Sequence, residues 1–236
     1  MNYIKNKIQL MILTLALPLC AFANNDNPSL PKEGIKIVPL ATMNLPDYIK
    51  EETKERINQQ NKKGYFETNT INGSFLFTMK HNTALEMKSF ANTTDPYDTH
   101  LKNSISQIKL AFSYNGIKDI EQKNIIGYSP MGSFKEGWTG IKTFFEDSKM
   151  GICSYSLLNM KIMGGGIQLN NESIRYDINK KPTTVDVEGS MKTGFHYIIS
   201  WYDEIYSNDL ECDNKIYDKE IISKMIILAN KIDNKN

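Results

Sequence analysis

The feature that most constrains the fold is a long β-rich region that begins at Ile117 and continues until the last helix. Its strand-like segments are separated by turns rich in glycine, proline and asparagine, with no helical pattern between them. Strands that do not alternate with helices favour an antiparallel sheet over a doubly wound parallel sheet. We therefore expect an α+β fold: an antiparallel, strongly bent sheet with two or three helices packed on it, including a C-terminal helix.

The stretch Gly151–Gly166, GICSYSLLNMKIMGGG, is expected to be one long strand of this sheet. Its apolar alternation moves from one face to the other at Leu157-Leu158, which requires either a β-bulge or burial on both faces. We favour the bulge. The three glycines that follow are expected to form a tight turn. A phosphate-binding loop would lead into a helix, whereas residues 167–169 are strand-like.

Two further strands carry informative side chains. Gly194 to Tyr202 has apolar bulk on both faces, which predicts a central strand. In Thr184 to Glu188, valines alternate with Asp186 and Glu188. We expect these acids to lie on the solvated face of a half-buried strand, and calcium binding is the alternative.

Three segments have the periodicity or the end signals of helices. Residues 46–62 begin with a proline, end before Gly64 and carry few apolar side chains, which predicts a surface helix. Residues 217–232 have the broad apolar stripe of a helix packed on a core. A third helix is expected from the N-cap Asp95 to Gly116, and residues 65–91 before it are expected to form two strands with His81 in their turn. The apolar residues of this third helix recur three or four positions apart: Tyr97, Leu101, Ile105, Ile108 and Phe112.

The first residues have the features of a secretory signal peptide. Two lysines precede a short apolar run, and Ala21-Phe22-Ala23 fits cleavage after Ala23. The run is shorter than the roughly 20 residues of a spanning helix; a membrane anchor and lipoprotein processing at Cys20 are the alternatives. We expect a periplasmic or secreted protein, from a bacterium judging by the many Asn, Lys and Ile residues. The expected parts are a signal peptide at 1–23, a lead segment at 24–45 and one α+β domain at 46–236.

Cleavage would leave two cysteines, Cys153 and Cys212. An even number of cysteines in an exported protein predicts a disulfide. Closing a loop of about 60 residues would stabilise the protein by roughly 4 kcal/mol. The alternative is two buried free thiols.

The charge balance excludes one class of partner. The sequence has 28 Lys and Arg residues against 27 Asp and Glu, a net charge of +1. General binding to nucleic acid requires a strongly basic face, so we expect no nucleic-acid partner. No apolar run after the signal is long enough to span a bilayer, so we also expect no membrane insertion after cleavage.

No catalytic, metal or nucleotide motif stands out. A G-x-S-x-G nucleophile motif is absent, as are H-E-x-x-H and EF-hand patterns. The three histidines, His81, His100 and His196, are scattered along the chain. We expect no cofactor and no metal, and we favour a non-catalytic protein over an enzyme.

Two aromatic stretches are candidate ligand-binding surfaces. One is the glycine-rich segment 127–138, expected to be a loop that carries Tyr128, Phe134 and Trp138. The other is Trp201 and Tyr202, which precede acidic residues. Core packing is the alternative explanation for each of them.

These observations favour an exported bacterial envelope or secreted protein that binds a protein or a small ligand. The second hypothesis is a secreted hydrolase built from dispersed acids and a histidine, with His196, Asp203 and Glu204 as the residues to test. The third is a virulence factor directed to a host, because export permits that destination.

Overall fold

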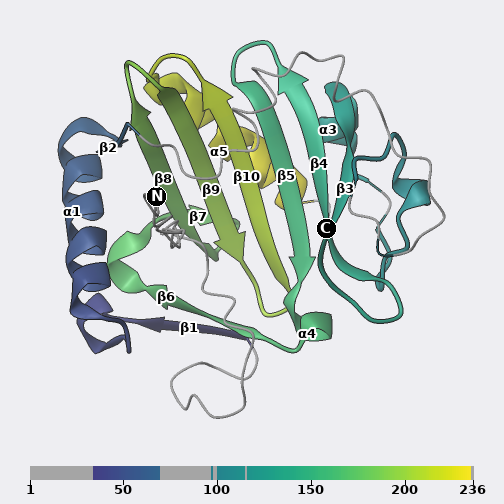
Figure 1. The fold of residues 1–236 in the computed structure, drawn as a ribbon, viewed down its shortest axis with the longest axis horizontal. Coiled ribbons are helices and arrows are strands. Elements are labelled where there is room, and N and C mark those ends of the chain that lie inside the picture. The colour runs from purple at the N-terminus through teal and green to yellow at the C-terminus, as the bar shows by residue number, and fades with distance from the viewer. Residues whose placement is uncertain (1–33, 70–96, 98–99, 115, 235–236) are drawn as a thin grey trace, which may run out of the picture.

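The described residues of the computed structural model are 34–69, 97, 100–114 and 116–234. They form an α+β protein whose main element is an eight-stranded sheet (Figure 1). Its strands are β2 (Phe66–Glu67), β3 (Asn124–Phe134), β4 (Trp138–Asp147), β5 (Gly151–Asn159), β7 (Ile174–Ile178), β8 (Lys181–Ser190), β9 (Gly194–Tyr202) and β10 (Tyr206–Asn214). They lie in the order β2-β8-β9-β10-β5-β4-β3, and β7 also pairs with β8. All pairings in this sheet are antiparallel except β2 with β8.

A second, two-stranded parallel sheet joins β1 (Gly34–Val38) to β6 (Gly166–Asn170). The helices are α1 (Asp47–Lys63), α3 (Lys118–Glu121), α4 (Met160–Met163) and α5 (Lys219–Asp233). Short 3-10 turns occupy Leu40–Thr42, Ile105–Gln107 and Asn171–Ser173. Within the described ranges, no helix is both long and apolar enough to cross a membrane.

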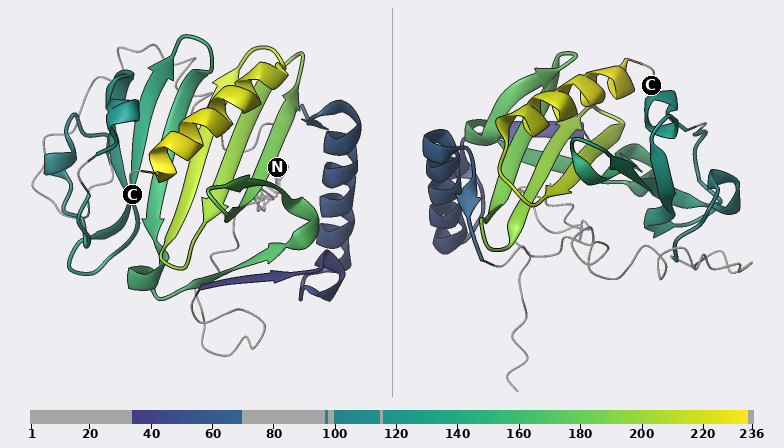
Figure 2. Two further views of the ribbon diagram at one scale, coloured as in Figure 1. Left: turned by 180° about the vertical axis from the view of Figure 1, so that it is seen from behind. Right: turned by 90° about the horizontal axis from the view of Figure 1, so that it is seen from above.

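The C-terminal helix α5 covers one face of the large sheet, which we call the helix face (Figure 2). The side chain of Asp218 accepts a hydrogen bond from the backbone N–H of Glu220 and so caps the helix. The apolar stripe predicted for this helix is buried on the sheet and forms the main core with alternate residues of the strands. The buried residues of the stripe are Ile221, Met225, Leu228, Ala229 and Ile232.

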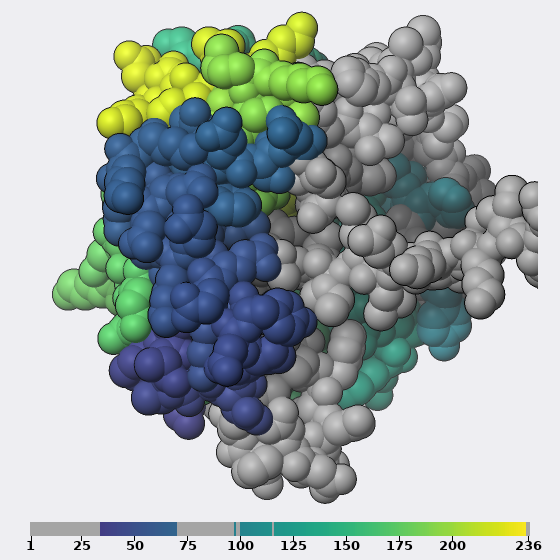
Figure 3. All heavy atoms as spheres, turned by 60° about the vertical axis from the view of Figure 1, so that its left-hand side comes forward, coloured from purple at the N-terminus to yellow at the C-terminus, as the bar shows by residue number. Residues whose placement is uncertain are grey.

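The surface helix α1 stands along the β8 edge of the sheet (Figures 1 and 3). As predicted, it begins after Pro46 and ends at Gly64, which has a left-handed φ of 90°. A Cβ atom on Gly64 would clash with the hydroxyl of Tyr217. Both the backbone conformation and the close contact therefore require glycine at this turn.

The prediction of a bulge in the stretch Gly151–Gly166 is wrong. β5 pairs with β4 and β10 without a register shift, and its residues from Cys153 onward are buried. Burial on both faces, the alternative, explains the apolar residues on either side of Leu157-Leu158. The strand ends at Asn159, whose side chain caps the single turn of α4, and Gly164 ends that turn with a φ of 77°.

The helix predicted to end at Gly116 is also absent from the described residues of that segment; residues 95–96 and 98–99 lie outside the described ranges. Residues 100–114 contain one 3-10 turn, which begins with a capping box at Ser104. Their backbone groups bond instead to the neighbouring hairpin, through bridges of Lys102 with Tyr128 and of Leu110 with Trp138. Backbone hydrogen bonds to a sheet edge thus replace those within a helix. The predicted hairpin at 65–91 lies outside the description beyond residue 69, and so does His81.

Candidate functional site

The sheet face opposite α5 carries charged and hydroxyl side chains, and we call it the polar face. Because side chains alternate along a strand, the registers of β4, β5, β8, β9 and β10 bring these residues together on one side. No described helix packs across it: α1 stands at its β8 edge (Figures 1 and 2). The charged and hydroxyl side chains of the polar face include Lys142, Ser154, Ser156, Asp186, Glu188, His196, Ser200, Asp209, Glu211 and Asp213. The apolar residues Phe144, Ile152 and Ile198 lie on the same side.

Most of these side chains are withdrawn from solvent. The exposed fractions are 7% for the side chain of Asp186, 4% for Glu188, 4% for His196 and 0% for Asp213. In a two-layer fold, polar residues on the uncovered sheet face normally reach water. Buried polar groups are costly unless they are paired, so the partners of each group decide what this face can do.

The centre of the polar face is His196 on β9. Its Nδ1 lies 2.6 Å from an oxygen of Asp213, and its Nε2 lies 4.0 Å from an oxygen of Glu211. Burial lowers the pKa of His196, but the hydrogen bond and charge of Asp213, with the charges of Glu211 and Glu188, raise it overall. The surrounding carboxylates therefore favour the cationic form of the imidazole.

Lys142 on β4 completes this chain of alternating charges. Its Nζ lies 3.0 and 3.2 Å from the two carboxylate oxygens of Glu211. Burial raises the pKa of Glu211, but the charges of Lys142 and His196 lower it overall. The array Lys142–Glu211–His196–Asp213 therefore joins β4, β10 and β9, with basic and acidic side chains in alternation.

Asp209, next to this array, behaves differently. It accepts a hydrogen bond of 2.5 Å from the hydroxyl of Ser200, but burial raises its pKa to about 6. This carboxyl group therefore exchanges its proton close to neutral pH.

Helix α1 contributes Arg56 to the polar face. Its Nη1 lies 2.7 Å from Glu188 and 3.4 Å from Asp186, and its guanidinium stacks on Phe66. The prediction that these two acids form a solvated face is therefore wrong, because the guanidinium from α1 covers them. Burial and repulsion from Glu188 raise the pKa of Asp186, and the charge of Arg56 opposes that rise without cancelling it.

Three polar atoms of this face are buried without a hydrogen-bond partner. They are the hydroxyl of Ser154 and one carboxylate oxygen each of Asp186 and Glu188. Such an atom costs about 1–3 kcal/mol of stability when it is left unpaired. An ionised carboxylate oxygen can only accept hydrogen bonds. The two unpartnered oxygens of Asp186 and Glu188, at the α1 edge of the face, therefore require hydrogen-bond donors. Outside this face, the described residues leave four more such atoms, on Gln60, Ser133, Thr143 and Tyr217.

Ser154 and His196 do not form the nucleophile and base of a serine hydrolase. Ser154 lies on β5 and His196 on β9, with β10 between them. Neighbouring strands are about 4.8 Å apart, so the serine and the imidazole are too far apart for proton transfer. A metal centre is not formed either: no three His, Cys, Asp or Glu residues of the described part have the geometry to hold an ion.

The structure does not bring together the hydrolase residues proposed from the sequence. Asp203 lies beyond the far end of β9, where it pairs with Lys181 and caps the following turn. A strand rises about 3.3 Å per residue, so Asp203 lies about 20 Å from His196. The acids beside His196 are instead Asp213 and Glu211, from a strand that follows it in the chain.

Trp201 and Tyr202 are buried on opposite faces of β9. Trp201 is in the main core, where it stacks on Tyr155 and donates a hydrogen bond to Asp233. Tyr202 belongs to a small second core with Met160, at the end of the polar face where the β1–β6 pair lies. Both side chains are at most 1% exposed, and a role in ligand binding stays a prediction for them.

The segment 127–138 is a β-hairpin and not the expected loop, because most of it pairs within β3 and β4. Tyr128 is buried against the main core. Phe134 and Trp138 stack edge to face at the end of the hairpin, with ring centroids 5.5 Å apart. Tyr97 packs on Phe134 and is 65% exposed. Phe134 and Trp138 are thus part of an aromatic cluster at the surface, and their binding role also stays a prediction.

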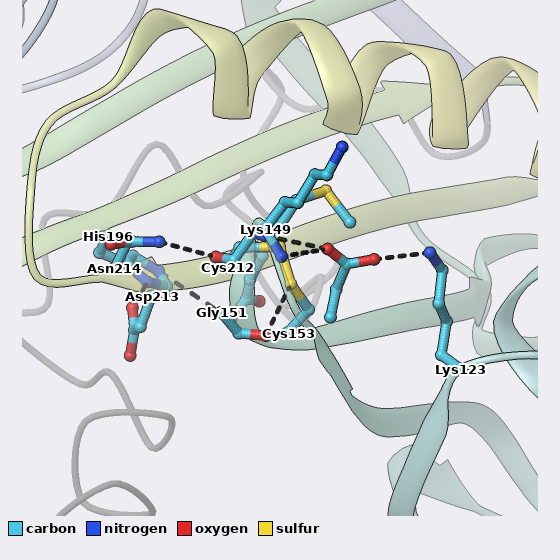
Figure 4. Close-up of a disulfide and its surroundings, with 11 residues drawn as sticks. Lys123, Lys149, Gly151, Cys153, His196, Cys212, Asp213 and Asn214 are labelled. Atoms are coloured by element: carbon cyan, nitrogen blue, oxygen red, sulfur yellow. Dashed lines mark hydrogen bonds and ion pairs between the residues drawn. A yellow bond between two sulfur atoms is a disulfide. The ribbon is translucent and has the colours of Figure 1, made fainter.

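The predicted disulfide between Cys153 and Cys212 is confirmed (Figure 4). The two residues are direct register partners on β5 and β10, with Cα atoms 4.1 Å apart. Their side chains lie in the main core on the helix face. The next residue of β10 is Asp213, so the disulfide fixes the strand that holds the partner of His196.

Sequence reasoning missed Lys142, Asp209, Glu211, Asp213 and Arg56. One pattern could have indicated them. Residues 209–213 of β10, D-L-E-C-D, alternate acids with apolar residues, and β10 pairs with β9, which carries His196. No protein-family model, curated protein or solved structure matches this chain. The polar face is therefore interpreted from its own chemistry.

Proposed function

We propose that the protein is an exported binding protein that holds a small polar ligand against the polar face of its sheet. Export is supported by the signal-like first residues and by the disulfide, since disulfides persist in oxidising compartments. Binding is supported by the three buried polar atoms without partners on this face. These atoms carry the proposal.

Unpaired buried polar atoms favour a ligand because folding alone gives no reason to keep them. Most buried polar groups in proteins have a hydrogen-bond partner. An alanine at Ser154 would remove an unpaired hydroxyl at little cost in packing. A ligand with suitable polar groups would form hydrogen bonds with Ser154, Asp186 and Glu188. These groups are already removed from water in the folded protein, so binding does not incur their desolvation cost again.

One observation favours hydrolysis as a second candidate: the 2.6 Å hydrogen bond between His196 and Asp213 resembles that of a general base and its orienting acid. A general base must be neutral, however, and the four carboxyl groups around His196 favour its cation. The side chain of Glu211, bound by Lys142, lies toward Nε2. Ligand binding is therefore the better-supported function.

Thermal unfolding of residues 24–236 in the presence of amines, amino acids and sugars tests the proposal. We expect at least one class to raise the midpoint in proportion to the logarithm of its concentration. The same compounds should raise it less in a Ser154→Ala variant. The matched control is Ser223→Ala, an exposed serine on α5. Equal shifts in all three proteins, or no shift with any class, would contradict binding at this face.

A further inference from the structure

Resting on the proposed binding function, we infer that the ligand carries an organic cation, an ammonium or guanidinium group, that binds to Asp186 and Glu188 at the α1 edge of the polar face. The rest of the ligand then extends over β9 and β10 toward Ser154.

The two acids present a preformed acceptor pair. They lie two residues apart on β8, so both project to the same face. Each uses one oxygen to bind Nη1 of Arg56 and leaves its other oxygen buried without a partner. The side chains are 93% and 96% buried, because their exposed fractions are 7% and 4%. An ammonium group, with three donors, can pair with both free oxygens.

The charge on the polar face has the matching sign. Its carboxyl groups belong to five residues: Asp186, Glu188, Asp209, Glu211 and Asp213. Three cationic groups pair with them directly: Arg56, Lys142 and His196. Arg175 is near enough to affect Asp186, but the donor that it uses binds the backbone carbonyl of Ile57. Carboxyl groups exceed cations even when Arg175 is counted, so an added cation is favoured over an added anion.

A proton or a metal ion is a poorer occupant than an organic cation. A proton can neutralise one carboxyl group but supplies a single donor for two acceptors. A metal ion requires several ligands in one shell, and the described residues offer no group of three. A cationic ligand also competes with a proton for Asp186, whose pKa is raised by burial, so the affinity of the ligand should fall as the pH falls.

Calorimetric titration of residues 24–236 with matched cationic and neutral probes tests the inference. The probes are 1,4-diaminobutane and agmatine, compared with 1,4-butanediol. We expect binding of at least one cation and none of the diol. Asp186→Asn and Glu188→Gln should each weaken that binding by about tenfold or more, as expected for a charge-assisted hydrogen bond. The control Asp203→Asn removes a carboxylate that pairs with Lys181 away from this face, and it should leave the affinity unchanged.

A measurement on the unaltered chain covers the case in which the Asp186 or Glu188 variant fails to fold. The affinity of the cation should fall as the pH falls, because burial raises the pKa of Asp186 and its proton competes with the cation, and a constant affinity would overturn the inference. Equal binding of diol and diamine would also overturn it. If sugars or other neutral compounds bind in a Ser154-dependent way while both cations fail, the cation inference falls and the proposed function stands. If no compound of either kind binds, both fall.

Discussion

The two faces of the same sheet are built on different principles. On the helix face, alternate residues of the strands pack with α5 in an apolar core that includes the disulfide. On the polar face, many of the residues in between form charge pairs, and three buried polar atoms have no hydrogen-bond partner. Both faces are buried, but the polar face is held by charge pairs and hydrogen bonds where the helix face is held by apolar packing. We propose that the comparison separates residues that stabilise the fold from residues that bind a ligand.

The largest loss of stability is expected when a large side chain is removed from the helix face. Trp201 is fully buried and donates a hydrogen bond to Asp233. Trp201→Ala should lower the free energy of unfolding by about 3–5 kcal/mol, through lost burial and a cavity. Urea unfolding followed by circular dichroism measures the change. Ile227→Ala, on the exposed side of α5, should change stability by no more than about 0.5 kcal/mol. Similar losses in both variants would contradict the assignment of the core.

Reduction of the disulfide should have the next largest effect. The bond between Cys153 and Cys212 closes a loop across 59 sequence positions. Its removal by Cys153→Ala with Cys212→Ala should cost about 2–4 kcal/mol. The same urea titration, with and without reductant, measures it. Reductant should not change the midpoint of the double variant, and a shift there would mean that the loss has another cause.

The elements of the helix face could be predicted from the sequence better than the polar face could. The C-terminal helix, the strand Gly194–Tyr202 and the disulfide could be predicted, because each depends on local periodicity or on a single available partner. The helix ending at Gly116 was predicted wrongly, since its apolar spacing also suits an irregular segment that bridges to Tyr128 and Trp138.

The polar face could not be predicted because it depends on register. His196 and Asp213 meet only because β9 and β10 pair at these positions, and Arg56 reaches Asp186 across 130 residues of sequence. The acids of β8 alternate with valines, which is also the pattern of a strand with one solvent-exposed face. Nothing local indicates that a helix far earlier in the chain covers them.

Part of the pH dependence of stability should come from Asp209 on the polar face. Burial raises the pKa of Asp209 to about 6 from an ordinary value of 3.8. The folded state therefore binds this proton more tightly than the unfolded state does, and the stabilisation is complete below about pH 4 and lost as the pH rises through about 6. In urea titrations at four pH values over this range, the free energy of unfolding should depend less on pH for Asp209→Asn than for the unaltered protein. Parallel curves would show that Asp209 does not titrate in this way.

The smallest expected effects contrast two serines of the polar face. Ser200 donates a hydrogen bond to Asp209, whereas Ser154 has no partner. Ser200→Ala should destabilise the protein by about 1–2 kcal/mol, and Ser154→Ala should be neutral or stabilising by up to about 1 kcal/mol. Differential scanning calorimetry of both variants measures the signs. Equal destabilisation would mean that Ser154 is a structural residue and not a binding residue.

The most direct test of the account is to observe where a cation binds. Carboxyl carbon NMR signals of Asp and Glu are followed in residues 24–236 while 1,4-diaminobutane is added. The account predicts saturable shifts of the Asp186 and Glu188 signals, with those of Asp203 and Asp218 unchanged. Shifts spread evenly over exposed acids, or no shift at Asp186 and Glu188, would contradict the central claim that the polar face is a ligand site.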